Sequence, residues 1–221
     1  GNLPKDRNES SSRSSRRMST TTDNLHRFLR TRRSIRRFKP DPVPESVLTA
    51  ILTTAAYAPS AHHRQPWRFV ILADAPAKTK LADAMATDFQ RDLEDDGVPS
   101  GQIQQQLQRS KDRILSAPTI VLLCLDMTEM NVYSDRRRVK AEFRMTVQSV
   151  AAAGMQLLLA AHAEGLGGVW ACWPLFAQTA IQQALNLPEV WDPQGMIFIG
   201  YPQQIPEARE RKPLQDITLY L

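Results

Sequence analysis

Arg32-Arg33-Ser34-Ile35-Arg36-Arg37-Phe38 is the segment around which the chain is organised, with four arginines and one hydroxyl ahead of an aromatic side chain. A guanidinium is planar, stays charged at any working pH and donates hydrogen bonds in pairs. Several guanidiniums beside a hydroxyl therefore suit a phosphate monoester. Charge alone also fits a basic segment that simply lies in water, and on that ground this second interpretation is favoured.

A second polar segment follows about one helix later. Residues 58–69 read Ala-Pro-Ser-Ala-His-His-Arg-Gln-Pro-Trp-Arg-Phe, and their two prolines predict a loop that leads into a strand over 68–73. Residues 45–57, between the two segments, carry apolar side chains at helical spacing. Together the arginine-rich segment and this loop indicate a cofactor site.

The remaining elements follow from hydrophobic periodicity. Residues 118–125 are a continuous apolar run, which predicts a central strand covered on both faces. Residues 139–164 predict the longest helix, and its apolar second half is expected to be buried all round, in the core or at a subunit interface. A glycine cap at Gly165 and then a strand are predicted after it. Further predicted elements are helices over 75–94, 101–115 and 176–185 and extended segments over 194–201 and 216–221.

The basic charge is concentrated near the N-terminus. Residues 1–38 hold eleven Lys or Arg against three Asp or Glu, so the rest of the chain is acidic although the net charge is +5. Residues 1–22 have almost no apolar side chains, which predicts a disordered tail ahead of one domain over 23–221. A short helix is expected from Asp23, with Asp23 or Asn24 as its N-cap. Because the body is not basic, a nucleic-acid partner is not expected, although an adaptor that uses the basic N-terminus is an alternative.

Composition also restricts where the protein is expected to act and which partners and metals it is expected to bind. The apolar runs are too short to span a bilayer and the N-terminus lacks a signal-peptide core, so we expect a cytoplasmic protein without a membrane partner. Cys124 and Cys172 lie among apolar residues without metal-binding spacing, which predicts two buried thiols and no metal site.

Four motifs in a shared order resemble the nitroreductase family of FMN-dependent oxidoreductases. They are RRSIRRF at 32–38, the APSAHHRQPWRF loop at 58–69, the alanine-rich helix that runs into GLGGVWACW at 165–173, and RERKP at 209–213. The resemblance covers about residues 25–221. Within the family, the chain is most similar to the reductase domain that is fused to a glutamyl ligase in deazaflavin-coenzyme biosynthesis, which shares the His-His loop and the Gly-x-x-Trp segment.

The resemblance implies an α+β fold with a central, mostly antiparallel sheet wrapped by helices. It also implies an intertwined homodimer with two FMN molecules at the subunit interface. By position, the residues that match the family's contacts to the phosphate and the ring edge are Arg32, Arg33, Ser34 and Arg36. Arg209 and Arg211 match a basic pair that closes on the same phosphate; without the resemblance they would be interpreted as exposed charges on a turn.

The remaining implied contacts concern the flavin ring. Gln65 matches a loop residue that reaches the ring from one protomer, and His63 stands where many relatives carry Asn. The segment Gly167 to Trp173 corresponds to a stretch beside the pyrimidine edge, where backbone N–H groups stabilise negative charge. Its implied cofactor residues are Gly168, Trp170, Ala171, Cys172 and Trp173. Trp170 and Trp173 are expected either to cover the cofactor or to fill the core.

The implied activity passes a hydride from NADPH or NADH through the flavin to a quinone, nitro compound or other unsaturated acceptor. No catalytic side chain is required, because the flavin carries the chemistry, and His63 is assigned only a hydrogen bond to flavin or substrate. Two alternatives stay open. One is reduction of a dehydro precursor of the deazaflavin coenzyme, and the other is a flavin-binding store or sensor without turnover.

Overall fold

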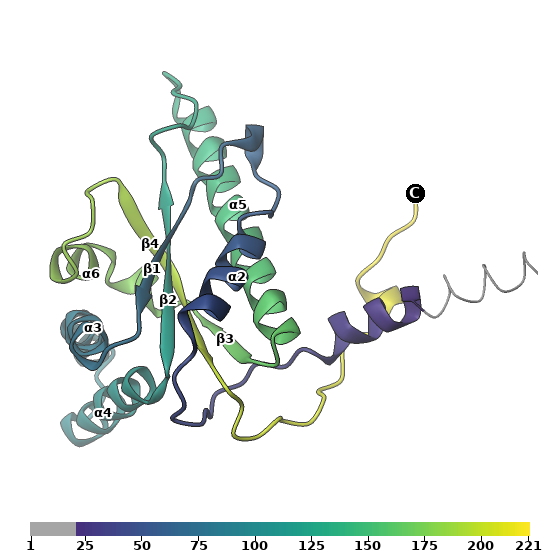
Figure 1. Cartoon of the computed structure of the whole chain (residues 1–221). Coiled ribbons are helices and arrows are strands. Elements are labelled where there is room, and N and C mark those ends of the chain that lie inside the picture. Colours follow the sequence, from purple (N-terminus) through teal and green to yellow (C-terminus); the bar gives the residue numbers. More distant parts are fainter. Residues whose placement is uncertain (1–20) are drawn as a thin grey trace, which may run out of the picture. The chain divides into compact units, whose positions relative to one another are not determined.

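A computed structural model describes residues 21–221, which divide into two compact units (Figure 1). The larger unit spans residues 33–206, and the described part of the smaller unit comprises residues 21–32 and 207–221. The disordered tail predicted over 1–22 falls almost entirely on residues outside the described part. The single domain predicted over 23–221 stays a prediction.

A four-stranded sheet forms the centre of the larger unit. Its spatial order is β1 (Trp67–Leu72), β2 (Thr119–Asp126), β4 (Trp191–Gly200) and β3 (Gly167–Ala171). Every neighbouring pair of strands is antiparallel. The predicted α+β fold with a mostly antiparallel sheet is therefore confirmed.

β2 explains why the sheet carries helices on both faces. All eight of its residues are buried, as the apolar run over 118–125 predicts. Because successive side chains of a strand point to opposite faces, Val121, Leu123 and Leu125 pack in one core and Ile120, Leu122 and Cys124 in the other.

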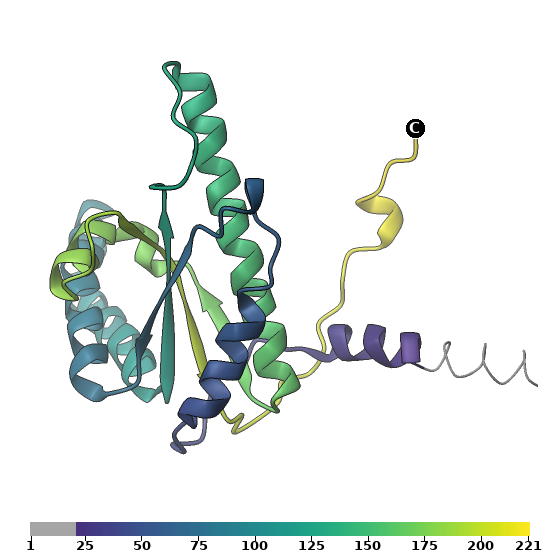
Figure 2. The ribbon, with the colours of Figure 1, turned by 45° about the horizontal axis from the view of Figure 1, so that its top comes forward.

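Two layers of helices cover these cores, and Figure 2 shows the sheet between them. One layer consists of α2 (Glu45–Ala55) and α5 (Arg136–Ala163). The other layer consists of α3 (Ala75–Asp95), α4 (Ser100–Ser116) and α6 (Gln178–Ala184).

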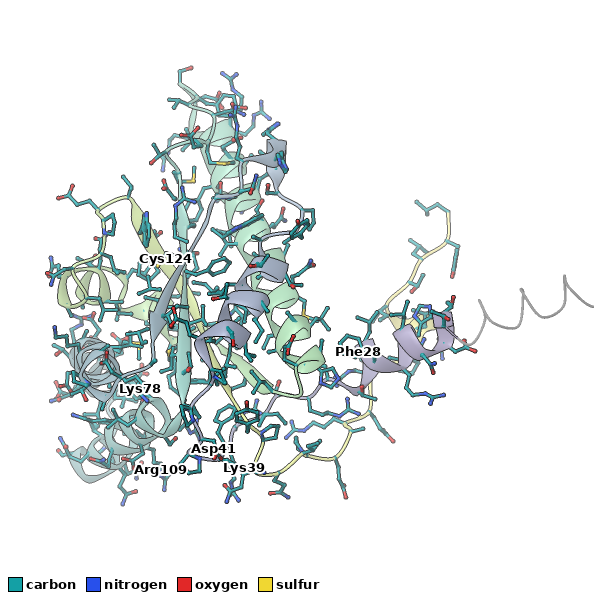
Figure 3. All side chains as sticks on the ribbon, viewed as in Figure 1. Phe28, Lys39, Asp41, Lys78, Arg109 and Cys124 are labelled. Atoms are coloured by element: carbon teal, nitrogen blue, oxygen red, sulfur yellow. The ribbon has the colours of Figure 1, made fainter. Side chains whose placement is uncertain are left out.

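A hydrogen bond connects the start of α3 to the end of α4. The buried Lys78, labelled in Figure 3, lies in the first turn of α3. It donates from Nζ to the carbonyl of Ala117, directly after α4, at 2.8 Å. Burial lowers the pKa of Lys78 against a smaller opposing effect of Asp74. A second link is the ion pair between Lys111 and Asp83, at 2.7 Å. The first half of α3 therefore lies beside the second half of α4.

α5 is partly exposed in the single chain. Met155, in the apolar second half that the sequence predicts to be buried, is 44% exposed, and Val139 and Phe143 in the first half are 48% and 40% exposed. The second half is therefore not wholly buried within one chain, and its burial at a subunit interface stays a prediction. Val139 and Phe143 lie four positions apart and share one face of the helix, whereas Met155 is displaced by about 120° round the helix from Phe143. The sheet packs against the buried side of α5, and these three side chains lie outside that core.

The end of α5 and the start of β3 agree with the sequence. Gly165 adopts a φ of +74°, the left-handed conformation that glycine provides at a helix end, and β3 begins two residues later. Cys172, by contrast, is exposed and not buried as predicted. It lies in the turn after β3, where the alternation of buried and exposed side chains no longer applies.

β4 starts three residues before the strand predicted over 194–201. Its register against β2 shifts between Gly195, which faces Leu123, and Pro193, which faces Cys124. Gln194 is therefore the extra residue of a bulge. A bulge accommodates a proline that cannot donate to the ladder, which explains why the strand continues through Pro193.

The smaller unit has little regular structure. Residues 21–31 are helical, so Asp23 and Asn24 lie inside the helix and the predicted N-cap is wrong. The short turn η3 (Leu214–Asp216) is the element in the C-terminal part. Beyond it Ile217, Leu219 and Tyr220 are exposed apolar side chains.

Candidate functional site

The arginine-rich segment runs alongside the edge strand β3. The backbone N–H of Ile35 donates to the carbonyl of Gly168 at 3.1 Å, and Ser34 pairs with Gly168 as an isolated parallel bridge. The buried Ile35 side chain fills the space above Gly167, where a Cβ would come within 2.5 Å of it. One buried isoleucine therefore anchors the polar residues on either side of it.

The far end of the segment is also held. Lys39 donates to the carbonyl of Tyr201 at 2.9 Å, and Gln203 donates to the carbonyl of Arg37 at 3.0 Å. Both contacts are to the chain that leaves β4. The backbone between Ile35 and Lys39 is thus bound at two places in the larger unit.

The side chains of this segment form a set of donors. Arg33 and Ser34 are half-buried, whereas Arg36 is exposed and contacts the carbonyl of Ser34 at 3.4 Å. No carboxylate occurs in residues 33–38, so nothing within the segment would repel an anion. The set has the chemistry that binds phosphate oxygens.

The loop before β1 has an unusual backbone. His62, His63 and Gln65 have φ values of 53°, 55° and 50°, in the left-handed region that side chains other than glycine rarely adopt. Each such residue costs about 1–3 kcal/mol unless its surroundings hold it. The side chains of His63 and Gln65 are exposed, and their Nε2 atoms lie 3.2 Å apart.

Two hydroxyls hold the first half of this loop. The Ser60 hydroxyl accepts from the backbone N–H of Gln65 at 3.0 Å, which closes the loop on itself. The Ser149 hydroxyl accepts from the N–H of Ala61 at 3.1 Å and donates to the carbonyl of Met145 at 2.8 Å. Since Ser149 belongs to α5, the loop is attached to the longest helix.

An ion pair holds the second half. Arg68 donates to the carbonyls of Gln65 and Trp67 at 3.2 and 2.9 Å, and its other terminal nitrogen lies 2.8 Å from Asp126 Oδ2. The backbone N–H of Asp126 donates to the carbonyl of Pro66 at 2.9 Å. The pKa of Asp126 is raised by burial, but hydrogen bonds from Thr128 and the charge of Arg68 outweigh that effect and leave it below its ordinary value.

The segment after Gly168 places its two tryptophans in different cores. Trp170 packs in the core of α2 and α5, and its ring lies so close to Gly154 and Gly195 that a Cβ there would come within 2.1 and 2.8 Å. Trp173 packs in the other core, edge-on to Phe198 at 5.9 Å between ring centroids. Both rings are half-buried and pack against the cores, and a contact of either with a cofactor stays a prediction.

The structure brings some of the predicted site residues together. Ser34, which follows Arg33 in the sequence, lies beside Gly168, and Ala171 and Cys172 follow at the end of β3. His63 and Gln65 belong to the loop that is attached to α5. Arg32, Arg209 and Arg211 belong to the smaller unit, and their assignment to the same phosphate stays a prediction.

Sequence reasoning missed the residues that hold the loop. Ser60 and Arg68 lie inside the quoted motif, and Ser149 is a polar exception on an apolar helix face. The sequence shows that these side chains are polar, but it does not show which groups they bind. Within residues 21–221, no cluster of His, Cys, Asp and Glu is suited to a metal ion, and no helix is long and apolar enough to cross a membrane.

Comparison with known proteins identifies the family. The family model described as the nitroreductase family matches residues 29–201, well over half of the chain. The chain belongs to the nitroreductase family. The predicted family and the predicted class of enzyme, a nitroreductase-type oxidoreductase, are therefore confirmed. The closer likeness to the deazaflavin ligase/reductase stays a prediction.

Individual relatives are similar to this chain over nearly its whole length, in sequence or in fold. A Bacillus subtilis protein named NAD(P)H nitroreductase YfhC is 29% identical over 192 residues, which cover 87% of this chain and 91% of that protein. A nitroreductase structure from Desulfovibrio desulfuricans in complex with FMN is 27% identical, with a TM-score of 0.67 over 89% of this chain and 96% of the other. A BluB-like flavoprotein from Clostridium difficile 630, 23% identical with a TM-score of 0.75 over 89% and 98%, shares the fold.

Proposed function

We propose that the chain is an FMN-dependent oxidoreductase that transfers a hydride from NADPH or NADH to a quinone, nitro compound or other unsaturated acceptor. One observation carries the proposal: the hydrogen bond between Ile35 and Gly168, which sets a group of guanidinium and hydroxyl donors beside β3. The FMN bound in the Desulfovibrio desulfuricans relative and the name of the Bacillus subtilis relative support the cofactor and the donor.

The donor set of the larger unit fits FMN. Arg33, Ser34 and Arg36 supply two guanidiniums and a hydroxyl, which suit a phosphate with nearly two negative charges. Arg32, Arg209 and Arg211 would complete the neutralisation of that phosphate. When bound, FMN supplies a ring nitrogen, N5, that accepts and returns a hydride.

The chain's own residues then have positioning and electrostatic roles. His63 and Gln65 present an imidazole and an amide from a loop whose backbone is already bent into shape. Backbone N–H groups from Ala171 to Trp173 would stabilise negative charge at the pyrimidine edge of the ring. Nothing in this scheme requires a nucleophile or a general base from the protein.

We further propose that the active form is a homodimer. The exposed apolar side chains of α5, Val139, Phe143 and Met155, and the exposed apolar residues at the C-terminus both support an interface between two copies. Such a dimer would also cover the side of α5 that the sequence predicts to be buried.

The first experiment examines the purified protein by visible spectroscopy. We expect a yellow protein whose flavin absorbance bleaches when NADPH or NADH is added without oxygen. A flavin that binds but is not reduced by either nucleotide would favour a store or sensor, and a protein that binds no FMN would overturn the proposal.

A pair of variants tests the phosphate assignment. Arg32→Ala combined with Arg211→Ala removes two of the proposed partners, so FMN should be lost during dialysis. Arg91→Ala is the matched control, because Arg91 lies on α3 and pairs with Asp88 at 2.6 Å. Full retention of colour in the double variant would contradict the assignment.

A further inference from the structure

A cavity of 820 Å³ lies in the larger unit between α3, α4 and the short turn η2 (Trp173–Phe176). Its volume is in the range of small-molecule sites. Ala82 and Met85 line the cavity and also belong to the core that α3, α4 and α6 cover. The cavity therefore lies on the side of the sheet that faces away from α5.

The sheet separates this cavity from the loop that is assigned to the flavin ring. Ser149 on α5 holds that loop through Ala61, and α5 packs in the opposite core (Figure 2). Trp173 lines the cavity and packs in the core of α3. A molecule in the cavity would therefore lie away from His63 and Gln65.

The two helices give the cavity walls of different character. On α3 the apolar lining residues recur every three or four positions, so they share one face of that helix. They are Ala82, Met85, Ala86, Phe89 and Leu93. On α4 the lining residues that share one face in the same way are polar. They are Gln102, Gln105, Gln106, Arg109 and Arg113. A ligand between the helices would meet an apolar wall on one side and hydrogen-bond donors on the other.

The charged groups of the cavity are segregated. Arg109 and Arg113, one helical turn apart on α4, line it and are exposed (Figure 3 shows Arg109). Among the carboxylates of residues 21–221, none forms an ion pair with either guanidinium, whereas Lys111 between them is neutralised by Asp83. Two guanidiniums are thus free to bind an anion.

The acidic residues of the cavity come from the other end of the helix pair. Asp92 and Asp96 belong to the last turn of α3 and its C-cap. Because the first half of α3 lies beside the second half of α4, the two arginines and the two carboxylates are at opposite ends. An anionic group would be attracted to the end with the arginines and repelled at the other.

We propose that this cavity is a second ligand site, separate from the flavin, for a molecule with an apolar chain and a single anionic head group. The head group pairs with Arg109 and Arg113, and the chain lies along the apolar wall of α3. A fatty carboxylate has this chemistry. The inference goes beyond the proposed function and does not rest on it.

The test uses two probes with the same alkyl chain, decanoate and 1-decanol, of which only the first is charged. Their dissociation constants are measured by isothermal titration calorimetry for the wild-type holoprotein and for R109Q/R113Q and R109K/R113K. R136Q/R137Q is the matched control. It removes the same charge from two exposed residues of α5 that do not line the cavity.

In R109Q/R113Q we expect decanoate to bind about tenfold more weakly, because two charge-assisted contacts are lost at an exposed site. The affinity for 1-decanol should not change, and the lysine pair should restore most of the affinity for decanoate. Wild-type affinity for decanoate in R109Q/R113Q would overturn the proposal. An equal loss in R136Q/R137Q would also overturn it, since the attraction would then come from net charge alone.

The apolar wall has its own variant, Phe89→Ala. Phe89 is half-buried and lines the cavity, so its removal should weaken the binding of both probes about tenfold. Thermal unfolding by circular dichroism checks that the variant is folded. A folded Phe89→Ala protein that binds both probes as the wild type does would contradict the placement of the chain on α3.

The flavin absorbance shows whether the two sites are separate. Decanoate at saturation should leave the bound FMN in place, and displacement of FMN would overturn the proposal of a separate site. Decanoate that binds with the expected dependence on Arg109 and Arg113, to a protein that binds no FMN, would support the cavity and contradict the proposed function. A flavin reduced by NADPH or NADH in a protein without saturable binding of decanoate would do the reverse.

Discussion

At the scale of single residues, the loop before β1 depends on a few long-range contacts. Three of its residues adopt left-handed backbone conformations, and Ser149, Arg68 and Asp126 offset that cost with hydrogen bonds and an ion pair. The exposed side chains of His63 and Gln65 receive their orientation from this backbone. Substitution of one of the supporting residues should therefore also disturb the proposed contacts of His63 and Gln65 with the flavin.

Asp126→Asn removes the charge that Arg68 faces. We expect the free energy of unfolding to fall by about 1–2 kcal/mol at pH 7, because a hydrogen bond to a charged group is lost. The pKa of Asp126 lies below its unfolded value, so its contribution is present above that unfolded value and is lost as pH falls through the folded pKa. Urea denaturation of both proteins at pH 7 and at pH 3 should show the difference shrinking in acid. Asp41→Asn, at an exposed position, is the control.

Ser149→Ala leaves the N–H of Ala61 without its acceptor. The free energy of unfolding should fall by about 1–2 kcal/mol, and FMN should bind severalfold more weakly because the loop is less well held. Fluorescence titration with FMN measures the second effect. Thr53→Ala is the matched control, since the exposed Thr53 hydroxyl donates only to the carbonyl of Thr49 within its own helix. Equal FMN affinity of wild type and Ser149→Ala would count against the loop as a flavin contact.

At the scale of elements, β3 is held to the sheet and to α5 by close approach around Trp170. Gly154 on α5 and Gly195 on β4 lie against its ring and leave no room for a side chain. The helix and two strands are thus packed at a single tryptophan. This contact also determines how the segment from Gly168 to Trp173 leaves the sheet.

Gly154→Ala tests this packing. An added Cβ would lie 2.1 Å from the Trp170 ring, so we expect the free energy of unfolding to fall by about 1–3 kcal/mol through overpacking. Gly101→Ala is a control of opposite sign, because a Cβ there meets nothing within 4 Å and alanine is the better helix former by up to about 1 kcal/mol. Thermal unfolding by circular dichroism compares the two variants. A neutral Gly154→Ala would show that α5 moves away from β3 at little cost.

At the scale of the whole molecule, the exposed apolar side chains of α5 are the feature that a single chain does not explain. Val139, Phe143 and Met155 are large, and an apolar C-terminal end is exposed as well. Burial of such surface between two copies is favourable by about 25 cal/mol per Å².

Phe143→Glu combined with Met155→Glu should convert a dimer into monomers, because two charges would be buried without partners. Light scattering after size-exclusion chromatography measures the mass. The same variant should lose FMN if the cofactor lies at the interface. Val190→Glu, at a residue 53% exposed outside α5, should leave the mass unchanged. A wild-type monomer at micromolar concentration would contradict the homodimer.

Predictions from sequence succeeded where the signal is local. The apolar run of β2 and the glycine at the end of α5 are explained by residues within a few positions of each other. Cys172 was predicted wrongly because its exposure depends on a turn after β3, and hydrophobic neighbours in sequence do not report that turn. The start of β4 was missed because a bulge made room for Pro193.

The candidate site likewise combines residues that the motifs revealed with contacts that only the structure shows. Arg33, Ser34, His63 and Gln65 were recognised from motifs, yet the contact between Ser149 and Ala61 joins residues 88 positions apart. No periodicity connects such a pair. The cavity beside Arg109 also depends on how α3 packs against α4, and neither helix shows it alone.

The amino-acid sequence by itself determined a layered α+β protein of the nitroreductase family, because side-chain alternation along strands, helical spacing of apolar residues and short motifs are properties of neighbouring residues. Tertiary structure alone decided which hydroxyl holds the strained loop, which carboxylate faces Arg68 and which arginines line a cavity. These contacts join distant parts of the chain, and each forms only when the packed core has brought its two sides within hydrogen-bond distance.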